Sequence, residues 1–406
     1  MDLNYGKALV EKNRRPGKVP VYGTNGQCGW HDEPLAAGPG VILGRKGMGN
    51  LGVEWCEGNF WVIDTAYYVT PKIEDLDLKF FYYLIDYIGL NHLKDGTSNP
   101  SLSRDTFAAQ LIPWPPLATQ RAIAQILSSL DDKIELNRRM NETLEGMAQS
   151  IFKSWFVDFD PVRAKVAGRQ PAGMDADTAA LFPDQLDVVD SGDIPTGWKR
   201  GALQELQGDE QYAITAGPFG SNLTRQDYAS SGVPVIRGSN MAASNGWFDE
   251  SDFVFVSPAK AASLRANQAR PGDVLFTQRG TLGQVSLIPT CSHYPTYIIS
   301  QSQMKMTCAS WVPPEYVFLN FKLPSVIEYI AANATATGVP HINLSFLRQF
   351  PILIPFRKVL ERFARVIGPI FQTITERARE NTMLAAMRDA LLPKLLSGAI
   401  RVGDGK

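Results

Sequence analysis

The chain contains the same unit twice. Residues 100–156 can be laid on residues 340–396 without a gap, so that Pro115 meets Pro355 and Arg139 meets Arg379. Further upstream, the segment Val-Pro-Val at residue 19 returns at residue 233. The distance between the copies is far longer than the few tens of residues of a solenoid unit. The repeat therefore predicts one globular domain followed by one long helix, present in two copies.

Hydrophobic periodicity divides the chain into five parts. Residues 1–117 and 197–356 mix short β-prone runs with helical patterns, whereas 118–156 and 357–406 carry apolar residues at spacings of three and four. As one helix, residues 118–156 would be about 58 Å long. Residues 157–196 are rich in Pro and Asp, which predicts a linker outside any core. The predicted fold class is α+β, with two mixed α/β domains separated by two long antiparallel coiled-coil helices in a pseudo-twofold repeat.

The two helices have matching apolar stripes, and each stripe must be covered. We expect the helices to pair with each other, with Asn137, Asn141 and Asn381 fixing the register from within the seam. The alternative is that each helix packs only on its own domain. Gly368-Pro369 predicts a break or kink near the start of the second helix, and Gly398 predicts its end.

Within the first domain, several short patterns predict individual elements. Residues 41–43, 53–55, 60–63 and 66–69 read as strands, and residues 78–93 read as an amphipathic helix. Asn25-Gly26 is a tight-turn signal.

Composition limits the function classes. The apolar fraction is 44%, the formal net charge is −1, and no apolar run is long enough to cross a membrane. The polar first residues are not a secretory signal, and four scattered cysteines fit a reducing cytoplasm. The four cysteines and four histidines show no ligand spacing, so no metal site is predicted. Because the chain has no net positive charge, any binding of nucleic-acid phosphates must come from local basic patches or from a partner.

A basic, glycine-flanked loop follows a Pro-Gly turn and a short strand in both copies. In the first copy it contains Arg45, Lys46 and Asn50, and in the second it contains Gln278, Arg279 and Thr281. Arginine can bond the guanine O6/N7 edge and glutamine the adenine N6/N7 edge, so these residues are candidate base contacts. The alternative is a solvated hairpin tip. Gly47-x-Gly49-x-x-Gly52 matches a dinucleotide fingerprint by letter, but a strand pattern follows it where that motif requires a helix.

Further candidates lie beside the repeated Val-Pro-Val segments and in the polar turns. Asn and Ser often cap turns, so each of these residues has a structural alternative. The candidate DNA contacts of this group are Tyr22, Asn25, Ser101, Ser221, Asn222, Arg237, Ser239, Asn240 and His341.

Several stretches resemble the DNA specificity subunit of type I restriction–modification systems. They include residues 19–26, 44–47 and 60–68, the end of the central helix from Lys133 through Phe159, and the closing run 391–398. The resemblance covers nearly the whole chain. It implies two target recognition domains that each read half of a bipartite sequence of double-stranded DNA. It also implies helices that set the spacer and dock two modification subunits.

The same resemblance implies a non-catalytic, cytoplasmic subunit without a cofactor of its own. S-adenosylmethionine, ATP and Mg²⁺ would be used by the modification and restriction subunits. One departure concerns the first domain: the second opens with residues 194–199, whereas Met1 aligns near Thr215. We therefore expect an edge strand to be missing from the first domain.

Two other classes of function remain open from the residues alone. Asp77-Leu78-Lys79 together with Asp64 weakly suggests a metal-dependent nuclease, although Asp75 and Asp77 also suit a helix N-terminus. A helical scaffold that binds proteins without reading DNA is the second alternative. No Asn/Asp-Pro-Pro-aromatic motif for amino methylation is present.

Overall fold

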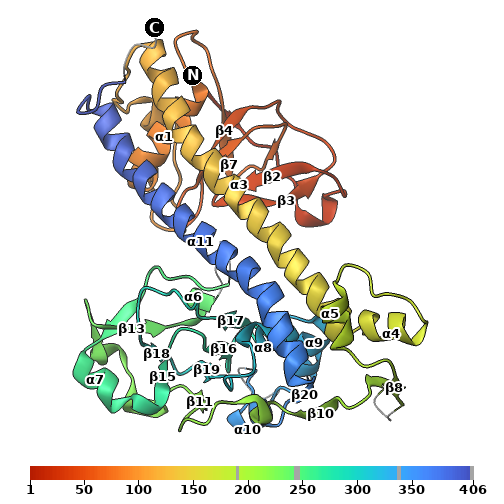
Figure 1. The fold of residues 1–406 in the computed structure, drawn as a ribbon. Helices are drawn as coiled ribbons and strands as arrows, with labels where there is room; N and C mark the ends of the chain where they lie inside the picture. Colours follow the sequence, from red (N-terminus) through yellow and green to blue (C-terminus); the bar gives the residue numbers. More distant parts are fainter. Residues whose placement is uncertain (189–191, 242–246, 336–339, 403–406) are drawn as a thin grey trace. The chain divides into compact units, whose positions relative to one another are not determined.

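The computed structural model describes residues 1–188, 192–241, 247–335 and 340–402. The chain forms two compact units, which are described separately (Figure 1). Unit 1 comprises Met1–Glu135 and Thr382–Lys406, and unit 2 comprises Leu136–Asn381. Each long helix contributes one end to each unit. The five-part division expected from the sequence stays a prediction, because the compact units divide the chain within the helices.

Unit 1 contains two sheets. The first is antiparallel, in the order β1-β7-β4-β5, with β1 Asp2–Tyr5, β7 Ala66–Thr70, β4 Gly40–Gly44 and β5 Val53–Cys56. The second has the order β3-β2-β6, with β3 Gly26–His31, β2 Val19–Gly23 and β6 Trp61–Val62, and β2 runs parallel to β6. The apolar run of β4 is fully buried, which explains why it lacks the alternation of a half-exposed strand.

The helices of unit 1 cover the first sheet. They are α1 Leu78–Ile88 and α2 Arg104–Ala108, with short 3-10 turns η1 Glu11–Asn13 and η2 Asn91–Leu93. The Asp77 carboxylate caps α1 by accepting the Phe80 N–H at 2.8 Å, and Gly89, with φ of 71°, ends it. Helix α1 therefore ends earlier than the predicted 78–93, because a glycine in the left-handed region closes it.

Unit 2 repeats this arrangement and adds to it. Its antiparallel sheet β11-β19-β16-β17 consists of Ile214–Ala216, Gln303–Met306, Val274–Thr277 and Val285–Leu287. Its second sheet, β12-β14-β13-β18-β15, consists of Tyr228–Ala229, Val254–Val256, Val233–Ile236, Tyr297–Ile299 and Gln268–Ala269, with β13 parallel to β18. Two further strand pairs are β10 Lys199–Ala202 with β20 Pro351–Ile354, and β8 Leu186–Asp187 with β9 Ile194–Pro195.

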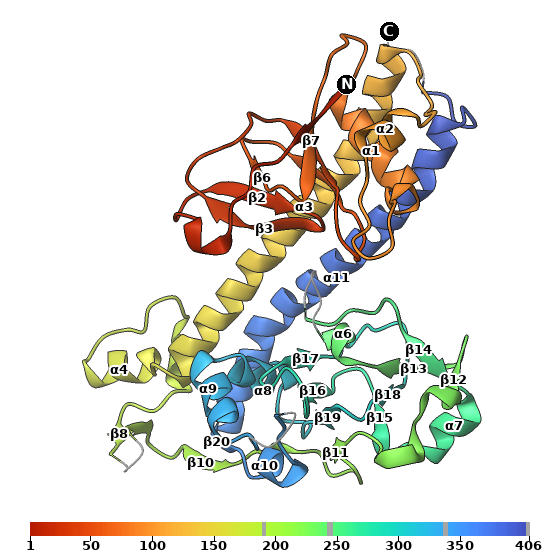
Figure 2. The same cartoon turned by 180° about the vertical axis from the view of Figure 1, so that it is seen from behind.

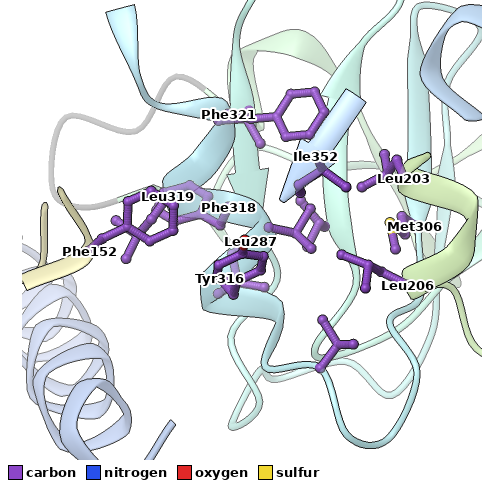
Figure 3. Packing of buried hydrophobic residues seen from close by; sticks show 14 of the residues in the cluster. Phe152, Leu203, Leu206, Leu287, Met306, Tyr316, Phe318, Leu319, Phe321 and Ile352 are labelled. Atoms are coloured by element: carbon purple, nitrogen blue, oxygen red, sulfur yellow. The ribbon is translucent and has the colours of Figure 1, made fainter. Parts of the chain in front are cut away.

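The core of unit 2 is built around α8 Pro314–Phe321. Tyr316, Phe318 and Phe321 point from this helix among residues from strands and from the long helix α3 Leu117–Phe156 (Figure 3). The other helices are α4 Asp160–Val166, α5 Ala176–Ala180, α6 Gly238–Met241, α7 Pro258–Ser263, α9 Pro324–Ala332 and α10 Leu344–Arg348. Short 3-10 turns are η3 Leu203–Leu206, η4 Gly220–Asn222, η5 Arg225–Asp227 and η6 Arg265–Asn267.

The long helices α3 Leu117–Phe156 and α11 Arg357–Leu396 lie side by side and antiparallel within each unit (Figures 1 and 2). In unit 1, Ile123 and Leu127 of α3 share a buried cluster with Leu392 and Leu395 of α11. In unit 2, the ring of Phe363 lies 5.0 Å from that of Phe156, centroid to centroid. The predicted antiparallel pairing is confirmed within each unit.

The predicted seam asparagines are buried in unit 2. The Asn137 side chain donates to Oδ1 of Asn381 at 2.9 Å, and the Asn141 side chain donates to the carbonyl of Ile374 at 3.2 Å. Asn137 and Asn381 are 0% and 1% exposed. Because a sliding helix would separate these buried amides, the arrangement favours a single register.

Two expectations about the helices and their connection are wrong. Helix α11 runs without interruption through Gly368-Pro369, so the expected break is absent, and the alternative of a kink stays a prediction. Phe363, Ile367 and Phe371 on either side are buried in the core and hold the helix in place. The 157–196 segment is not outside the core, since it folds into α4 and α5 and buries apolar side chains. Those side chains are Phe159, Val162, Phe182 and Ile194. The composition of the segment is rich in Pro and Asp, but its few apolar residues are sufficient to pack it against the core of unit 2.

The absence of an edge strand from unit 1 stays a prediction, but the two units do differ in one strand pair. The sheet of unit 1 keeps its edge strand β1, which pairs Leu3 with Val69 as β11 pairs Ile214 with Met306. The units differ in the strand pair that β10 and β20 form in unit 2. The counterpart of β20 in unit 1 is the segment 109–116. These residues form no strand in the described part of unit 1, and Leu111 is fully exposed.

Among the described residues, no helix has the length and apolar character needed to span a membrane.

Candidate nucleic-acid interface

The glycine loop of unit 1 is held by three backbone hydrogen bonds. It follows β4, the strand buried at the centre of the sheet. The Arg45 N–H donates to the carbonyl of Thr65 at 2.9 Å, and the Arg45 carbonyl accepts the N–H of Leu102 at 2.7 Å. The Gly47 N–H donates to the carbonyl of Pro100 at 3.0 Å. These bonds tie the loop to the predicted Ser101 turn, which also bridges to Lys46.

The loop of unit 2 is held by the same three bonds. The Gln278 N–H donates to the carbonyl of Ser302 at 2.7 Å, and the Gln278 carbonyl accepts the N–H of Ile342 at 3.1 Å. The Gly280 N–H reaches the carbonyl of Pro340 at 3.4 Å, and Arg279 bridges to His341. The repeat therefore extends from sequence to the backbone geometry of the loop, with Gln278 in the position of Arg45 and Arg279 in that of Lys46.

The outer residues of both loops are exposed. Lys46 and Asn50 in unit 1, and Arg279 and Thr281 in unit 2, present their side chains to solvent. Gly47 and Gly280 have φ of 141° and 98°, a region that residues with a Cβ rarely adopt. Each loop is thus a fixed backbone that displays different side chains, as two readers of different sequences require.

Arg45 and Gln278 are turned inward instead. The Arg45 guanidinium donates to the carbonyl of Asp64 at 2.8 Å and lies 5.1 Å from the ring centre of Tyr5. Gln278 is 7% exposed. Arg45 is therefore less available to a base edge than the sequence suggests, whereas Gln278 lines an open cavity.

The turn between β2 and β3 joins the loop of unit 1. The Thr24 hydroxyl donates to the carbonyl of Lys46 at 2.6 Å, and the adjacent Asn25 is exposed. Tyr22 requires a correction. It is 7% exposed, packs edge-on to Phe60, and burial raises the pKa of its hydroxyl, so it belongs to the core and not to a contact surface.

In unit 2, the residues after β13 divide into structural and exposed groups. Asn240 requires a correction: it is 2% exposed, accepts the N–H of Arg237 at 2.9 Å and donates to the carbonyls of Asp249 and Ser251. Its amide closes a turn and is not free to read a base. The guanidinium of Arg237 is paired with Asp252 at 3.2 Å, and Ser239 is exposed.

The remaining predicted residues lie near one another in the loops of unit 2. Ser221 and Asn222 are exposed on η4. They follow Phe219, an aromatic side chain that is 74% exposed. An exposed aromatic ring beside polar side chains is a suitable surface for stacking on a base.

Sequence reasoning missed a cluster in unit 1. The guanidinium of Arg104 lies 4.0 Å from the ring centre of Tyr5, the same ring that Arg45 approaches. Tyr5 in turn packs on Tyr67, with ring centres 5.1 Å apart. Tyr5 and Arg104 are 99 positions apart in sequence, so only the folded sheet could reveal the cluster.

The structure offers no support for a metal-dependent nuclease. Among residues 1–188, 192–241, 247–335 and 340–402, no group of three or more His, Cys, Asp or Glu side chains could hold a metal ion. Asp77 caps α1, as its position before the helix suggested. Gly52 is followed by β5 and not by a helix, so the context required for nucleotide binding is absent there.

Comparisons with known proteins agree with this architecture. Residues 2–146 match the family described as type I restriction modification DNA specificity domain. The fold is shared, with a TM-score of 0.58 and 16% identity, by the type I restriction–modification S subunit from M. genitalium, covering 97% of this chain and 93% of that one. The family match and the relatives described below confirm the resemblance seen in the motifs of the chain.

Two curated relatives carry the same description. The type I restriction enzyme HindI specificity subunit of Haemophilus influenzae is 28% identical over 387 residues, covering 84% of this chain and 81% of the relative. The MjaIX specificity subunit of Methanocaldococcus jannaschii is 25% identical over 345 residues, covering 83% of this chain and 72% of the relative.

Proposed function

We propose that this chain is the DNA sequence-specificity subunit of a type I restriction–modification complex. Each unit reads one half of a bipartite target in double-stranded DNA, and the chain itself catalyses no reaction. The observation that carries the proposal is the glycine loop, which has one backbone geometry in both units and different side chains in each. A protein that reads two different half-sites needs the same scaffold twice with different contact residues.

The exposed loop residues are the strongest contact candidates. Lys46 and Asn50 would serve the first half-site, and Arg279 and Thr281 the second. Arginine distinguishes guanine through a bidentate bond worth about 1–3 kcal/mol of discrimination. Lysine is equally suited to a phosphate, where it positions the protein without reading sequence.

The surrounding turns would complete each contact surface. Asn25 and Ser101 in unit 1, and Ser221, Asn222, Ser239 and His341 in unit 2, fit such a role by exposure or by contact with the loop.

The paired helices are suited to set the unread spacer between the half-sites. Each has 40 residues, which corresponds to roughly 60 Å of helix. Their buried asparagines favour one register, and a fixed register gives a fixed length. The exposed outer faces would dock two modification subunits, which a restriction subunit joins.

We assign the chemistry to those partners. S-adenosylmethionine would be used by the modification subunits, and ATP and Mg²⁺ by the restriction subunits, with no cofactor in this chain. The complex would act in the cytoplasm, where the DNA it protects and the foreign DNA it cleaves are both accessible.

The test is methylome sequencing of cells that carry the modification subunits and a variant of this chain. Arg279→Ala together with Gln278→Ala should relax only the second half-site, and Lys46→Ala should affect only the first. Unaltered half-sites in both variants would refute the assignment of the loops. A change in the other half-site would refute the division of labour between the units.

A second experiment tests the helices alone. Removing one heptad from both helices at facing positions should change the spacer or abolish methylation, while the identity of each half-site stays the same. A changed half-site would show that the helices contribute to base reading, contrary to the proposal.

A further inference from the structure

An open cavity of about 530 Å³ lies in unit 2 beside the glycine loop. Its lining is mostly small or polar, and it falls within the size range of small-molecule sites. The residues that line it include Thr215, Ala216, Phe219, Asn222, Asn267, Gln278, Asn343 and Ser345.

The equivalent strand position in unit 1 carries an aromatic ring. Gly6 and Gly217 close the edge strands β1 and β11 with equivalent bonds: the Gly6 N–H donates to the carbonyl of Ala66 at 3.2 Å, and the Gly217 N–H to that of Gln303 at 2.8 Å. The residue before each glycine is Tyr5 in unit 1 and Ala216 in unit 2. Unit 1 therefore carries a ring where unit 2 carries a methyl group.

The residues that surround the Tyr5 ring in unit 1 also differ from their equivalents in unit 2. Arg45 and Gln278 are equivalent through the loop bonds described above. Arg104 and Leu344 are equivalent as the first residues of α2 and α10. In unit 1 the two guanidinium groups lie 5.1 Å and 4.0 Å from the centre of the Tyr5 ring. Unit 2 has neither the ring nor the two cations at these positions, and its cavity is lined by Ala216, Gln278 and Leu344 instead.

The cavity contains hydrogen-bonding capacity that the protein leaves unused. Gln278 is 93% buried and lines the cavity, and its amide has no hydrogen bond within the described residues. The amide is therefore available to a ligand that enters the cavity. By contrast, Asn267 donates to the carbonyl of Ala216 at 2.7 Å, and Asn343 caps α10, so part of the polar lining is already fixed in position.

We propose that this cavity binds a nucleobase, adenine by preference, with the Gln278 amide bonded to the base edge and Phe219 beside the entrance. A planar ring fits because Tyr5 occupies the equivalent space in unit 1. A heteroaromatic ring is favoured over the side chain of Phe because the buried Gln278 amide requires a polar edge. An amide can donate to N7 and accept from N6 of adenine at once.

The base can come from two sources, a nucleotide turned out of the duplex or a free nucleoside. The inference rests on the proposed DNA recognition only for the first source. Extrusion from a duplex breaks base pairing and stacking, and new stacking together with a bonded amide can offset that loss.

The first experiment uses adenosine and the full chain. Saturation-transfer NMR should show contact with the adenine ring, and Gln278→Met should weaken binding about tenfold, the effect of losing roughly 1.4 kcal/mol. Ala216→Tyr, which installs the ring of unit 1, should abolish binding. Purine riboside, which lacks the amino group, should bind about tenfold more weakly than adenosine. Ala229→Tyr places a ring on an exposed strand residue elsewhere in unit 2 and should leave binding unchanged.

The second experiment uses the complex with modification subunits and the target duplex, whose sequence comes from the methylome. Placing 2-aminopurine at each adenine position of the second half-site should give a fluorescence increase at one position, and Ala216→Tyr should remove it. Adenosine binding without any such increase assigns the cavity to a free nucleoside. Gln278→Met keeps the test valid if Ala216→Tyr does not fold.

Three results would overturn the inference. The first is the absence of both adenosine binding and a fluorescence response. The second is adenosine binding that neither variant weakens. The third is a chain that does not bind adenosine and whose Ala216→Tyr variant no longer assembles with modification subunits. The last result would assign the cavity to an aromatic side chain of a partner protein. If the wild-type methylome still contains two half-sites in these cases, the proposed function stands and only the cavity assignment fails.

Discussion

A buried ion pair in unit 2 gives a quantitative prediction for Lys305→Met. The ammonium of Lys305 lies 3.3 Å from the carboxylate of Asp273, and the two residues are 3% and 0% exposed. The hydroxyl of Thr307 joins them, accepting from Lys305 at 2.7 Å and donating to Asp273 at 2.5 Å. The pair connects β19 to the residue before β16, the strand that leads into the glycine loop.

Removing the cation leaves the carboxylate buried without its charge partner. Breaking one side of a buried pair costs about 3–5 kcal/mol. For a unit of this size, each kcal/mol lowers the melting temperature by about 2–4 °C, so Lys305→Met should lower it by roughly 6–20 °C. Adding Asp273→Asn should recover much of the loss, because no buried charge then remains.

Differential scanning calorimetry measures the effect, and hydrogen exchange on peptides of β16 and β19 assigns the transition to unit 2. Lys199→Met is the matched control. Its ammonium lies 2.6 Å from the carboxylate of Glu205, but the two side chains are 63% and 39% exposed, so the melting temperature should change little. Equal losses for Lys305→Met and Lys199→Met would refute the reasoning that burial decides the value of these pairs.

Three further predictions concern the helix seam, pH and salt. Asn381→Leu should lower the free energy of unfolding in urea by about 1–3 kcal/mol, because the buried amide of Asn137 loses one partner. Adding Asn137→Leu should restore the stability while relaxing the register of the helices. An unchanged urea midpoint for the single variant would contradict this. The hydrogen bond from Lys260 lowers the pKa of Asp227 to about 2, so its contribution to stability is complete above the unfolded value and is lost as the pH falls toward 2. Carboxyl NMR titration of Lys260→Met should show a raised pKa, and an unmoved titration would contradict the assigned cause. Binding of DNA by the isolated chain should be weak and fall steeply with salt, gaining strength with modification subunits, and tight solo binding would argue against the inference from a net charge of −1.

The repeat and the hydrophobic periodicity predicted the two long helices to within one residue at their starts. They did so because a long apolar stripe at helical spacing has few ways to be buried. The break at Gly368-Pro369 was predicted from local preference, and the buried neighbours of that dipeptide outweighed it. The prediction that residues 157–196 lie outside the core was wrong for a similar reason. The burial of a few aromatic side chains stabilises the packed segment even though its average composition is polar.

The contact surface was predictable only in part. The glycine loops could be found because they recur, but the direction of each side chain depends on residues distant in sequence. Tyr22 lies within β2 and Asn240 follows β13, and burial assigns the first to the core and the second to a turn. The cavity had no signal in one copy alone, because the contrast between Tyr5 and Ala216 appears only when the two folded units are compared.

The division of the chain also has a consequence for the order of events during synthesis. Unit 2 is one continuous stretch, Leu136–Asn381, whereas unit 1 needs both Met1–Glu135 and Thr382–Lys406. Leu392 and Leu395 cover the apolar face of α1, so unit 1 can complete its core only after they leave the ribosome. A nascent chain released early would then carry a finished second unit and a first unit with exposed apolar surface. The half synthesised first is the half completed last, and quality control of the truncated product would depend on unit 1.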